Sequence, residues 1–164
     1  MLQAVPIPGL EISSRIAQQH VVPLCTWISA TGELPIISGE KRTILTPDTL
    51  SSWERNSECC FVLVRNSFPI AFAALSRQEA PLQEKSVEAV HLIVHPEFRR
   101  TGVGSAVHQA RLVKAFQLGF NTVLFRLVPE NAGALATLSR FCPEESSVCP
   151  VEGFTWFEIH AKKR

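Results

Sequence analysis

Hydrophobic and polar positions along the chain divide it into predicted strands and helices. Two apolar runs between residues 60 and 75 flank the polar Arg65-Asn66-Ser67, which is the pattern of a β-hairpin with a short turn. Residues 87–95 are rich in β-branched side chains and predict another strand, which Pro96 ends. Beyond it, segments in which apolar residues recur every three or four positions follow one another with segments in which every second residue is apolar. They predict helices at 102–119 and 132–141 and strands at 121–128 and 154–159.

The first 45 residues are less regular because prolines interrupt the apolar pattern. Only residues 21–28 predict a short buried segment, for which a helix is one interpretation. Further on, Thr46-Pro47-Asp48 is typical of a helix start, with Thr46 as the N-cap and Pro47 in the first turn. The elements follow in the order hairpin, strand, helix, strand, helix, strand. This order predicts an α/β (α+β) fold with a mixed sheet.

The size and charge of the chain narrow its class. Its 164 residues, of which 46% are hydrophobic, are enough for a single domain spanning residues 1–164. A net charge of +1 argues against binding of nucleic acid or an anionic membrane through bulk charge. No apolar stretch approaches the roughly 18 residues of a membrane span, and the first residues lack the pattern of a signal peptide. We therefore expect a cytoplasmic protein that binds neither nucleic acid nor membranes.

Cysteine and tyrosine content limits the chemistry that the chain can perform. The five cysteines are an odd number without a CxxC pair, which favours buried free thiols over a disulfide framework or a zinc site. No metal site is expected. The chain has 10 Phe and 3 Trp but no Tyr, so no phenol is available as an acid or a base.

The strongest local signal is the segment VHLIVHPEFRRTGVGSAV, residues 90–107, in which a strand, a basic turn and a helix start follow one another. Gly102 and Gly104 would let a ligand approach the backbone, and the N–H groups and dipole of the first helical turn would attract an anion. Between Glu97 and Arg126 there are five basic residues and one acidic residue. This excess of positive charge supports a phosphate site, although a solvated helix face has the same composition.

Residues 94–104, Val-His-Pro-Glu-Phe-Arg-Arg-Thr-Gly-Val-Gly, resemble the R/Q-x-x-G-x-G/A acetyl-coenzyme A signature of the GNAT N-acetyltransferases. Asn131-Ala132-Gly133-Ala134 is similar to the second motif of that family, N-x-x-A. The resemblance covers about residues 61–141 and is weak over the first 45 residues. It implies a mixed central sheet flanked by helices, with a splayed strand pair that holds coenzyme A, and it implies acetyl-CoA as the cofactor.

The resemblance also implies which residues bind this cofactor. Backbone groups of Leu92 and Val94 would hold the pantetheine and the thioester carbonyl, and residues 100–105 would wrap the pyrophosphate. Asn131 matches a position that hydrogen-bonds the pantetheine arm, and an N-cap role for its side chain is equally good chemistry. The cofactor-binding residues expected are Leu92, Ile93, Val94, Arg99, Arg100, Thr101, Gly102, Val103, Gly104, Ser105 and Asn131.

The implied reaction needs a base because an amine with a pKa of about 10.4 arrives as ammonium. Glu88, at the start of its strand, is the first candidate, and His91 and Glu130 follow it. On strict alternation Glu88 and Leu92 share one face and His91 lies on the other, unless a bulge shifts the phase. A solvated charge at position 88 and a core histidine at position 91 are the structural alternatives.

The usual acid is missing, since Leu138 stands where many members of the family have a tyrosine. A general acid contributes about 10²- to 10⁴-fold, whereas orientation of bound reactants contributes about 7–11 kcal/mol, so catalysis can survive its loss. We predict an N-acetyltransferase that transfers acetyl from acetyl-CoA to a primary amine by direct attack in a ternary complex. The alternatives are an acyl-enzyme on Cys142, a non-catalytic acyl-CoA-binding regulatory domain and an unrelated nucleotide-binding α/β protein.

The acceptor amine belongs to a small molecule or a protein. The resemblance implies that residues 1–45 form part of its binding site, because the family builds its amine-binding region largely from such N-terminal segments. A homodimer through the last strands is a further expectation from the resemblance.

Overall fold

A computed structural model describes residues 7–38, 41–76, 85–127, 131–141, 147–150 and 157–163 of the chain. Its strands form a seven-stranded mixed sheet in the order β1-β2-β3-β4-β5-β7-β6. They are β1 (Leu10–Ser13), β2 (Cys59–Arg65), β3 (Phe68–Ser76), β4 (Ser86–Val94), β5 (Thr122–Leu127), β6 (Ser147–Pro150) and β7 (Phe157–Lys162). β4 and β5 pair in parallel, and the other neighbouring strands pair antiparallel.

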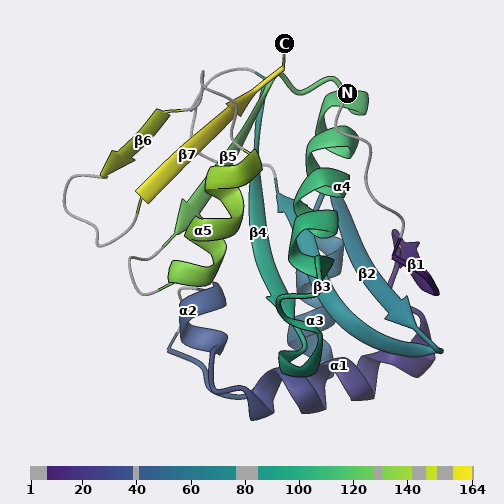
Figure 1. Ribbon diagram of the computed structural model, residues 1–164. Helices are drawn as coiled ribbons and strands as arrows, with labels where there is room; N and C mark the ends of the chain where they lie inside the picture. Colours follow the sequence, from purple (N-terminus) through teal and green to yellow (C-terminus); the bar gives the residue numbers. More distant parts are fainter. Residues whose placement is uncertain are drawn as a thin grey trace.

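Helices cover both faces of the sheet (Figure 1). They are α1 (Gln18–Ala30), α2 (Leu34–Ser38), α3 (Pro47–Arg55), α4 (Val103–Gln117) and α5 (Ala132–Phe141). The first three bury Leu24, Leu34 and Leu50 in a core on one face. The last two bury Val107 and Leu138 in a core on the other. The sheet is the middle layer between the two cores, and the predicted mixed sheet flanked by helices is confirmed.

The hairpin of β2 and β3 lies where the sequence predicts it. Its turn residues Asn66 and Ser67 have φ angles of 50° and 64°, the left-handed conformation that a two-residue turn between twisted strands requires. Pro69 pairs with Val64 next to a shift in the register of the two strands. The proline thus lies at an irregularity close to the start of β3, where a strand tolerates the loss of a backbone donor.

The helix starts also follow the sequence. Thr46 caps α3, because its side chain accepts a hydrogen bond from the N–H of Thr49 at 3.2 Å, and Pro47 is in the first turn. α1 is longer than the segment 21–28 from which a helix was predicted, and it contains Pro23. As the sixth residue of α1, Pro23 has no N–H to donate to the carbonyl four residues earlier, and α1 continues past this missing hydrogen bond to Ala30.

The sequence pattern predicts none of four short elements of three to five residues each, namely β1, α2, β6 and the 3₁₀ helix η1 (Pro96–Phe98). Such lengths contain too few positions for a period to be recognised. The predicted last strand, 154–159, overlaps β7, which runs from Phe157 to Lys162, three residues further than predicted; residues 154–156 lie outside the described residues.

Three cysteines of the described part of the chain test the prediction of free thiols. Cys25, Cys59 and Cys60 are free thiols, and burial raises the pKa of each. The prediction of free thiols is confirmed for these three, and Cys142 lies outside the described residues. Within the described ranges no helix has the length and apolar content needed to cross a bilayer.

Candidate active site

Strands β4 and β5 separate part of the way along their length. They pair from Ser86 and Thr122 as far as Ala89 and Phe125. Past Ala89, in the described ranges, β4 pairs with β3 alone. Past Ala89 the side of β4 that faces β5 therefore has no strand partner among the described residues, and its main-chain groups there are not used in strand pairing.

A bulge in β4 accompanies the separation. Val90 pairs with Ala74 and Ile93 with Phe72, so His91 and Leu92 together oppose a single residue of β3. His91 has a φ of 57°, a backbone conformation that residues with a side chain seldom adopt. The bulge shifts the alternation of side chains. Leu92 packs against the core under α4, whereas Ile93 belongs to the core under α1 and α3.

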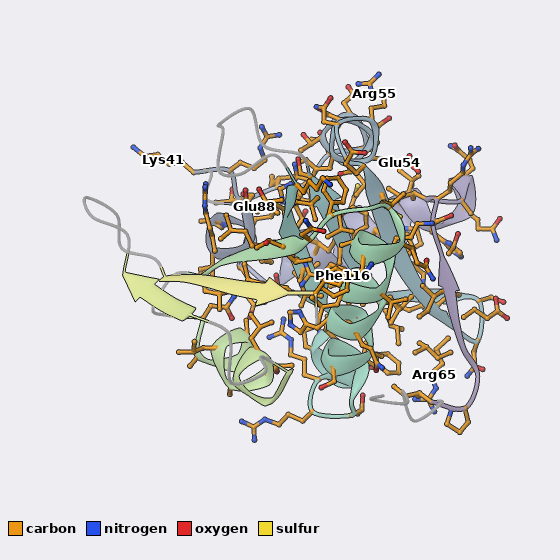
Figure 2. The ribbon with its side chains drawn as sticks, turned by 90° about the horizontal axis from the view of Figure 1, so that it is seen from above. Lys41, Glu54, Arg55, Arg65, Glu88 and Phe116 are labelled. Carbon is orange, nitrogen blue, oxygen red and sulfur yellow. The ribbon has the colours of Figure 1, made fainter. Side chains whose placement is uncertain are left out.

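Glu88 lies on the face of the sheet that α1 and α3 cover, since its neighbours Val87 and Ala89 are in the opposite core. Figure 2 shows it between α3, which carries Glu54 and Arg55, and α4, which carries Phe116. Glu88 is 6% exposed, and its Oε1 lies 3.7 Å from Nε of Arg126 on β5. It is therefore a buried carboxylate beside a cation and not a solvated charge.

His91 lies on the same face as Glu88, and the bulge is the reason. Its ring stacks on Trp53 of α3, with the ring centroids 4.0 Å apart and 8° between the planes. Its Nδ1 is buried and has no hydrogen-bond partner among the described residues. Burial, and to a smaller extent the charge of Arg111, lowers the pKa of His91 to about 4. The imidazole is thus neutral at neutral pH.

A pocket of about 420 Å³ opens beside His91 on this face. Its walls come from α3, the segments directly before and after α3, the end of β3 and the bulge of β4. They are mostly polar and consist of Arg42, Asp48, Thr49, Ser52, Trp53, Asn56, Ser57, Ser76 and His91. Ser76 is the partner of Glu88 in the pairing of β3 with β4, so the pocket and the buried carboxylate are neighbours.

The turn after β4 leads directly into α4. Gly102 is the N-cap of α4 with a φ of 90°, so no side chain caps the helix. A Cβ at position 104 would meet no atom within 4 Å. The space in front of the first helical turn is therefore open to a ligand, and its N–H groups and the helix dipole favour an anion there.

The basic residues predicted to surround this turn are more widely spread than their sequence suggests. In the turn itself, Arg99 donates from Nη1 to Glu33 at 2.8 Å and from Nε to the carbonyl of Val94 at 3.0 Å. Arg100 is exposed. The other three cations, Arg111, Lys114 and Arg126, lie further along α4 and on β5. Only part of the charge excess is therefore at the phosphate candidate.

The start of α5 has the second motif. Asn131 caps this helix, because its Oδ1 accepts a hydrogen bond from the N–H of Ala134 at 3.3 Å, as expected for the N-cap interpretation. Leu138 is 1% exposed in the core under α4 and has no acid function. Glu130 and Cys142, two further candidates from the sequence, lie outside the described residues.

Sequence reasoning did not single out Arg111 and His108 as site residues, although both are buried in α4, 1% and 2% exposed. The helical period does contain the signal for Arg111, because it lies four residues after Val107 and four before Ala115, and both are buried. A charged side chain is normally expected on the solvent side, and this expectation outweighed the period.

Comparison with known proteins gives a match by family and by fold. A model of the acetyltransferase (GNAT) family matches residues 26–142 of the chain. No curated protein matches the sequence.

Solved structures resemble the chain at low sequence identity. An N-acetyltransferase from Staphylococcus aureus Mu50 is 16% identical with a TM-score of 0.67, over 92% of this chain and 94% of that one. The PaiA N-acetyltransferase from Thermoplasma acidophilum, solved in complex with coenzyme A, is 13% identical with a TM-score of 0.72, over 94% and 99%. The protein yncA from Salmonella typhimurium, solved with its cofactor acetyl-CoA, is 15% identical with a TM-score of 0.67, over 93% and 91%. At these identities the likeness concerns the fold.

Proposed function

The chain belongs to the acetyltransferase (GNAT) family, and on this premise we propose that it transfers an acetyl group from acetyl-CoA to a primary amine. The observation that carries the proposal is the junction of two features. The open side of β4 past Ala89 lies next in sequence to the uncapped start of α4. One feature can bind an amide-containing arm through the main chain, and the other can bind a phosphate.

The described residues fit coenzyme A at this junction. Residues 100–105 would hold its pyrophosphate, since Gly102 has no side chain over the helix start and Gly104 leaves open space. The main chain of Leu92, Ile93 and Val94 would hold the pantetheine arm on the open side of β4. When bound, the cofactor supplies an acetyl group activated as a thioester. Structures of the PaiA and yncA proteins with coenzyme A and acetyl-CoA support this assignment.

The acceptor amine would enter from the face of the sheet that α1 and α3 cover. The pocket beside His91 lies there, and Arg42, which belongs to the segment predicted to form part of the acceptor site, is in its wall. Direct attack on the acetyl group requires both reactants to be bound at once, so the protein would contribute mainly by orienting them. The amine and the acetyl group would meet beside β4, past Ala89, where β4 no longer pairs with β5.

The amine must lose a proton before it attacks. We propose Glu88 as the base, because its carboxylate is buried next to the pocket on the same face of the sheet, where a carboxylate can accept a proton from a bound amine. His91 is the alternative. Its lowered pKa of about 4 makes it a weaker base than an ordinary histidine, although its neutral ring has a free Nδ1.

A second function is favoured by Leu138. The resemblance places a tyrosine acid at this position in many members of the family, and here the side chain is buried and apolar. A domain that binds acyl-CoA without turning it over would have no need of an acid. This non-catalytic domain is the alternative to the transferase.

One experiment separates the two. Coenzyme A binding is measured by calorimetry, and thiol release is then followed with acetyl-CoA and a panel of amines that includes amino acids, polyamines, aminosugars and lysine peptides. We expect binding together with thiol release on at least one amine. Binding without thiol release on every amine would favour the non-catalytic domain, and absence of binding would contradict both.

A further inference from the structure

The position of Arg111 is the starting point. Its guanidinium reaches from α4 to the sheet, where Nη1 donates to the carbonyl of Val90 at 3.4 Å and the charge lies 5.4 Å from the centre of the Phe125 ring. Phe125 pairs with Ala89, the last residue of β4 that pairs with β5, and Val90 follows Ala89. The guanidinium therefore sits at the point where the two strands separate.

The charge of Arg111 has no anionic partner in the described part of the chain. Nη2 donates to Nδ1 of His108 at 2.8 Å, and Nε is buried without any hydrogen-bond partner. Burial, and then the charge of Arg111, lowers the pKa of His108 to about 2, so that ring is neutral. Burial also lowers the pKa of Arg111 to about 9, which leaves it protonated at neutral pH.

A buried cation without an anion is costly, and proteins normally pair such a charge. The neighbouring groups do not supply the anion. His91 and His108 are neutral, and the one carboxylate described near the strand junction, Glu88, lies on the other face of the sheet beside Arg126. An anion that arises at the strand junction during function would remove this cost.

Resting on the proposed function, we infer that Arg111 stabilises the thiolate of coenzyme A as the acetyl group leaves it. In the transfer, the C–N bond to the amine forms and the C–S bond breaks with its electron pair moving to sulfur. The proton of the amine goes to the base. Arg111 keeps its protons throughout, and water protonates the thiolate after release. This charge would compensate for the missing phenol at Leu138 by electrostatic stabilisation instead of proton donation.

The test uses the thiol of bound coenzyme A rather than turnover. The ultraviolet absorbance of the thiolate is followed against pH for coenzyme A bound to the protein, with the desulfo analogue as the blank. A cation within about 4–6 Å lowers the pKa of an ionisable group by about 1–3 units, so the bound thiol should titrate below the value of about 8.5 typical of a free thiol. A bound thiol that titrates as the free thiol does would overturn the inference without any variant.

Variants then assign the effect to this residue. Arg111→Met should raise the pKa of the bound thiol by at least about one unit, whereas Arg111→Lys should keep most of the lowering. Lys114→Met is the matched control, because it removes a cation of the same helix that lies near Cys59, away from the strand junction. An equal thiol pKa in the wild type and in Arg111→Met would contradict the inference, even if that variant lost activity.

Two other outcomes are distinguishable. If coenzyme A does not bind to the wild type, the proposed function fails, and the inference fails with it. If Arg111→Met loses affinity for an acyl-CoA that ends in a carboxylate but keeps the thiol pKa unchanged, the charge serves the acyl group and the inference is wrong.

Discussion

A side chain at position 104 would point into open space. A small and a large substitution of Gly104 should therefore have different effects on coenzyme A affinity. Gly104→Ala adds only a methyl group, so coenzyme A affinity should stay within about threefold, and the free energy of unfolding should rise by about 0.5–1 kcal/mol because glycine weakens a helix. Gly104→Glu should weaken binding more than about tenfold through bulk and negative charge, since tenfold corresponds to about 1.4 kcal/mol.

The two variants are compared by calorimetry and by chemical denaturation. An acidic side chain in a first helical turn is compatible with the helix dipole, so the glutamate variant should remain folded. Equal affinities of the two variants for coenzyme A would place the phosphate site elsewhere.

Glu88→Gln tests the base. It should lower kcat/KM by about 10²- to 10⁴-fold on the best amine of the panel and flatten the rise of kcat/KM toward basic pH, because the group that accepts the proton is lost. Glu11→Gln, an exposed carboxylate on the edge strand β1, is the control and should keep the wild-type profile. An unaltered profile in Glu88→Gln would transfer the role to His91, Glu130 or water.

At the scale of elements, the cap of α3 matters because this helix forms one wall of the pocket. Thr46→Ala removes the side chain that accepts from Thr49, and it should lower the free energy of unfolding by about 1 kcal/mol in urea denaturation. Thr43→Ala, an exposed threonine just before the helix, is the control and should change stability by less than about 0.5 kcal/mol. Equal losses would mean that the cap contributes nothing.

The elements that could be predicted are those with a long period or a strong boundary signal. The hairpin around Asn66, the helix after Gly102 and the cap at Thr46 were all readable, because turn and cap residues act locally. β1 and α2 were not, since they are too short to show a period and are held by packing between elements distant in the sequence. The secondary structure of such segments depends on tertiary contacts.

In the candidate site, too, the features that depend on local sequence are predictable and those that depend on tertiary packing are not. The glycines at the start of α4 predict a ligand site from the sequence alone, because a backbone without side chains lets a ligand come close. The bulge at His91, the stacking of its ring on Trp53 and the burial of Arg111 depend on how sheet and helices meet. No local pattern contains that information, and the helical spacing of Arg111 from Val107 and Ala115 indicates its burial only when it is set against the usual exposure of a charged side chain.

At the scale of the molecule, the histidines whose pKa burial lowers, His91 and His108, make stability depend on pH. His91 has a pKa of about 4 in the folded chain, against an ordinary value of 6.5. The unfolded chain therefore binds the proton more tightly, so the stabilisation is complete above pH 6.5 and is lost as pH falls toward 4. The free energy of unfolding should decrease by about 1.4 kcal/mol per pH unit for this group within that window.

His91→Phe checks this dependence. It keeps an aromatic ring on Trp53 but cannot be protonated, so denaturation curves across the acidic range should show a smaller slope than the wild type. A slope identical to that of the wild type would mean that His91 does not contribute, and the dependence would then belong to His108 or to other groups.

The bulge of β4 also determines how the sequence can change over time. Before His91 the odd-numbered residues of β4 face the core under α4, and after it the even-numbered residues do. Many substitutions in either half would preserve both cores. The loss or gain of a single residue near position 91 would instead turn one half of the strand over, so that Leu92 and Ile93 would each face the wrong core. β4 should accordingly accept changes of residue far more readily than changes of length.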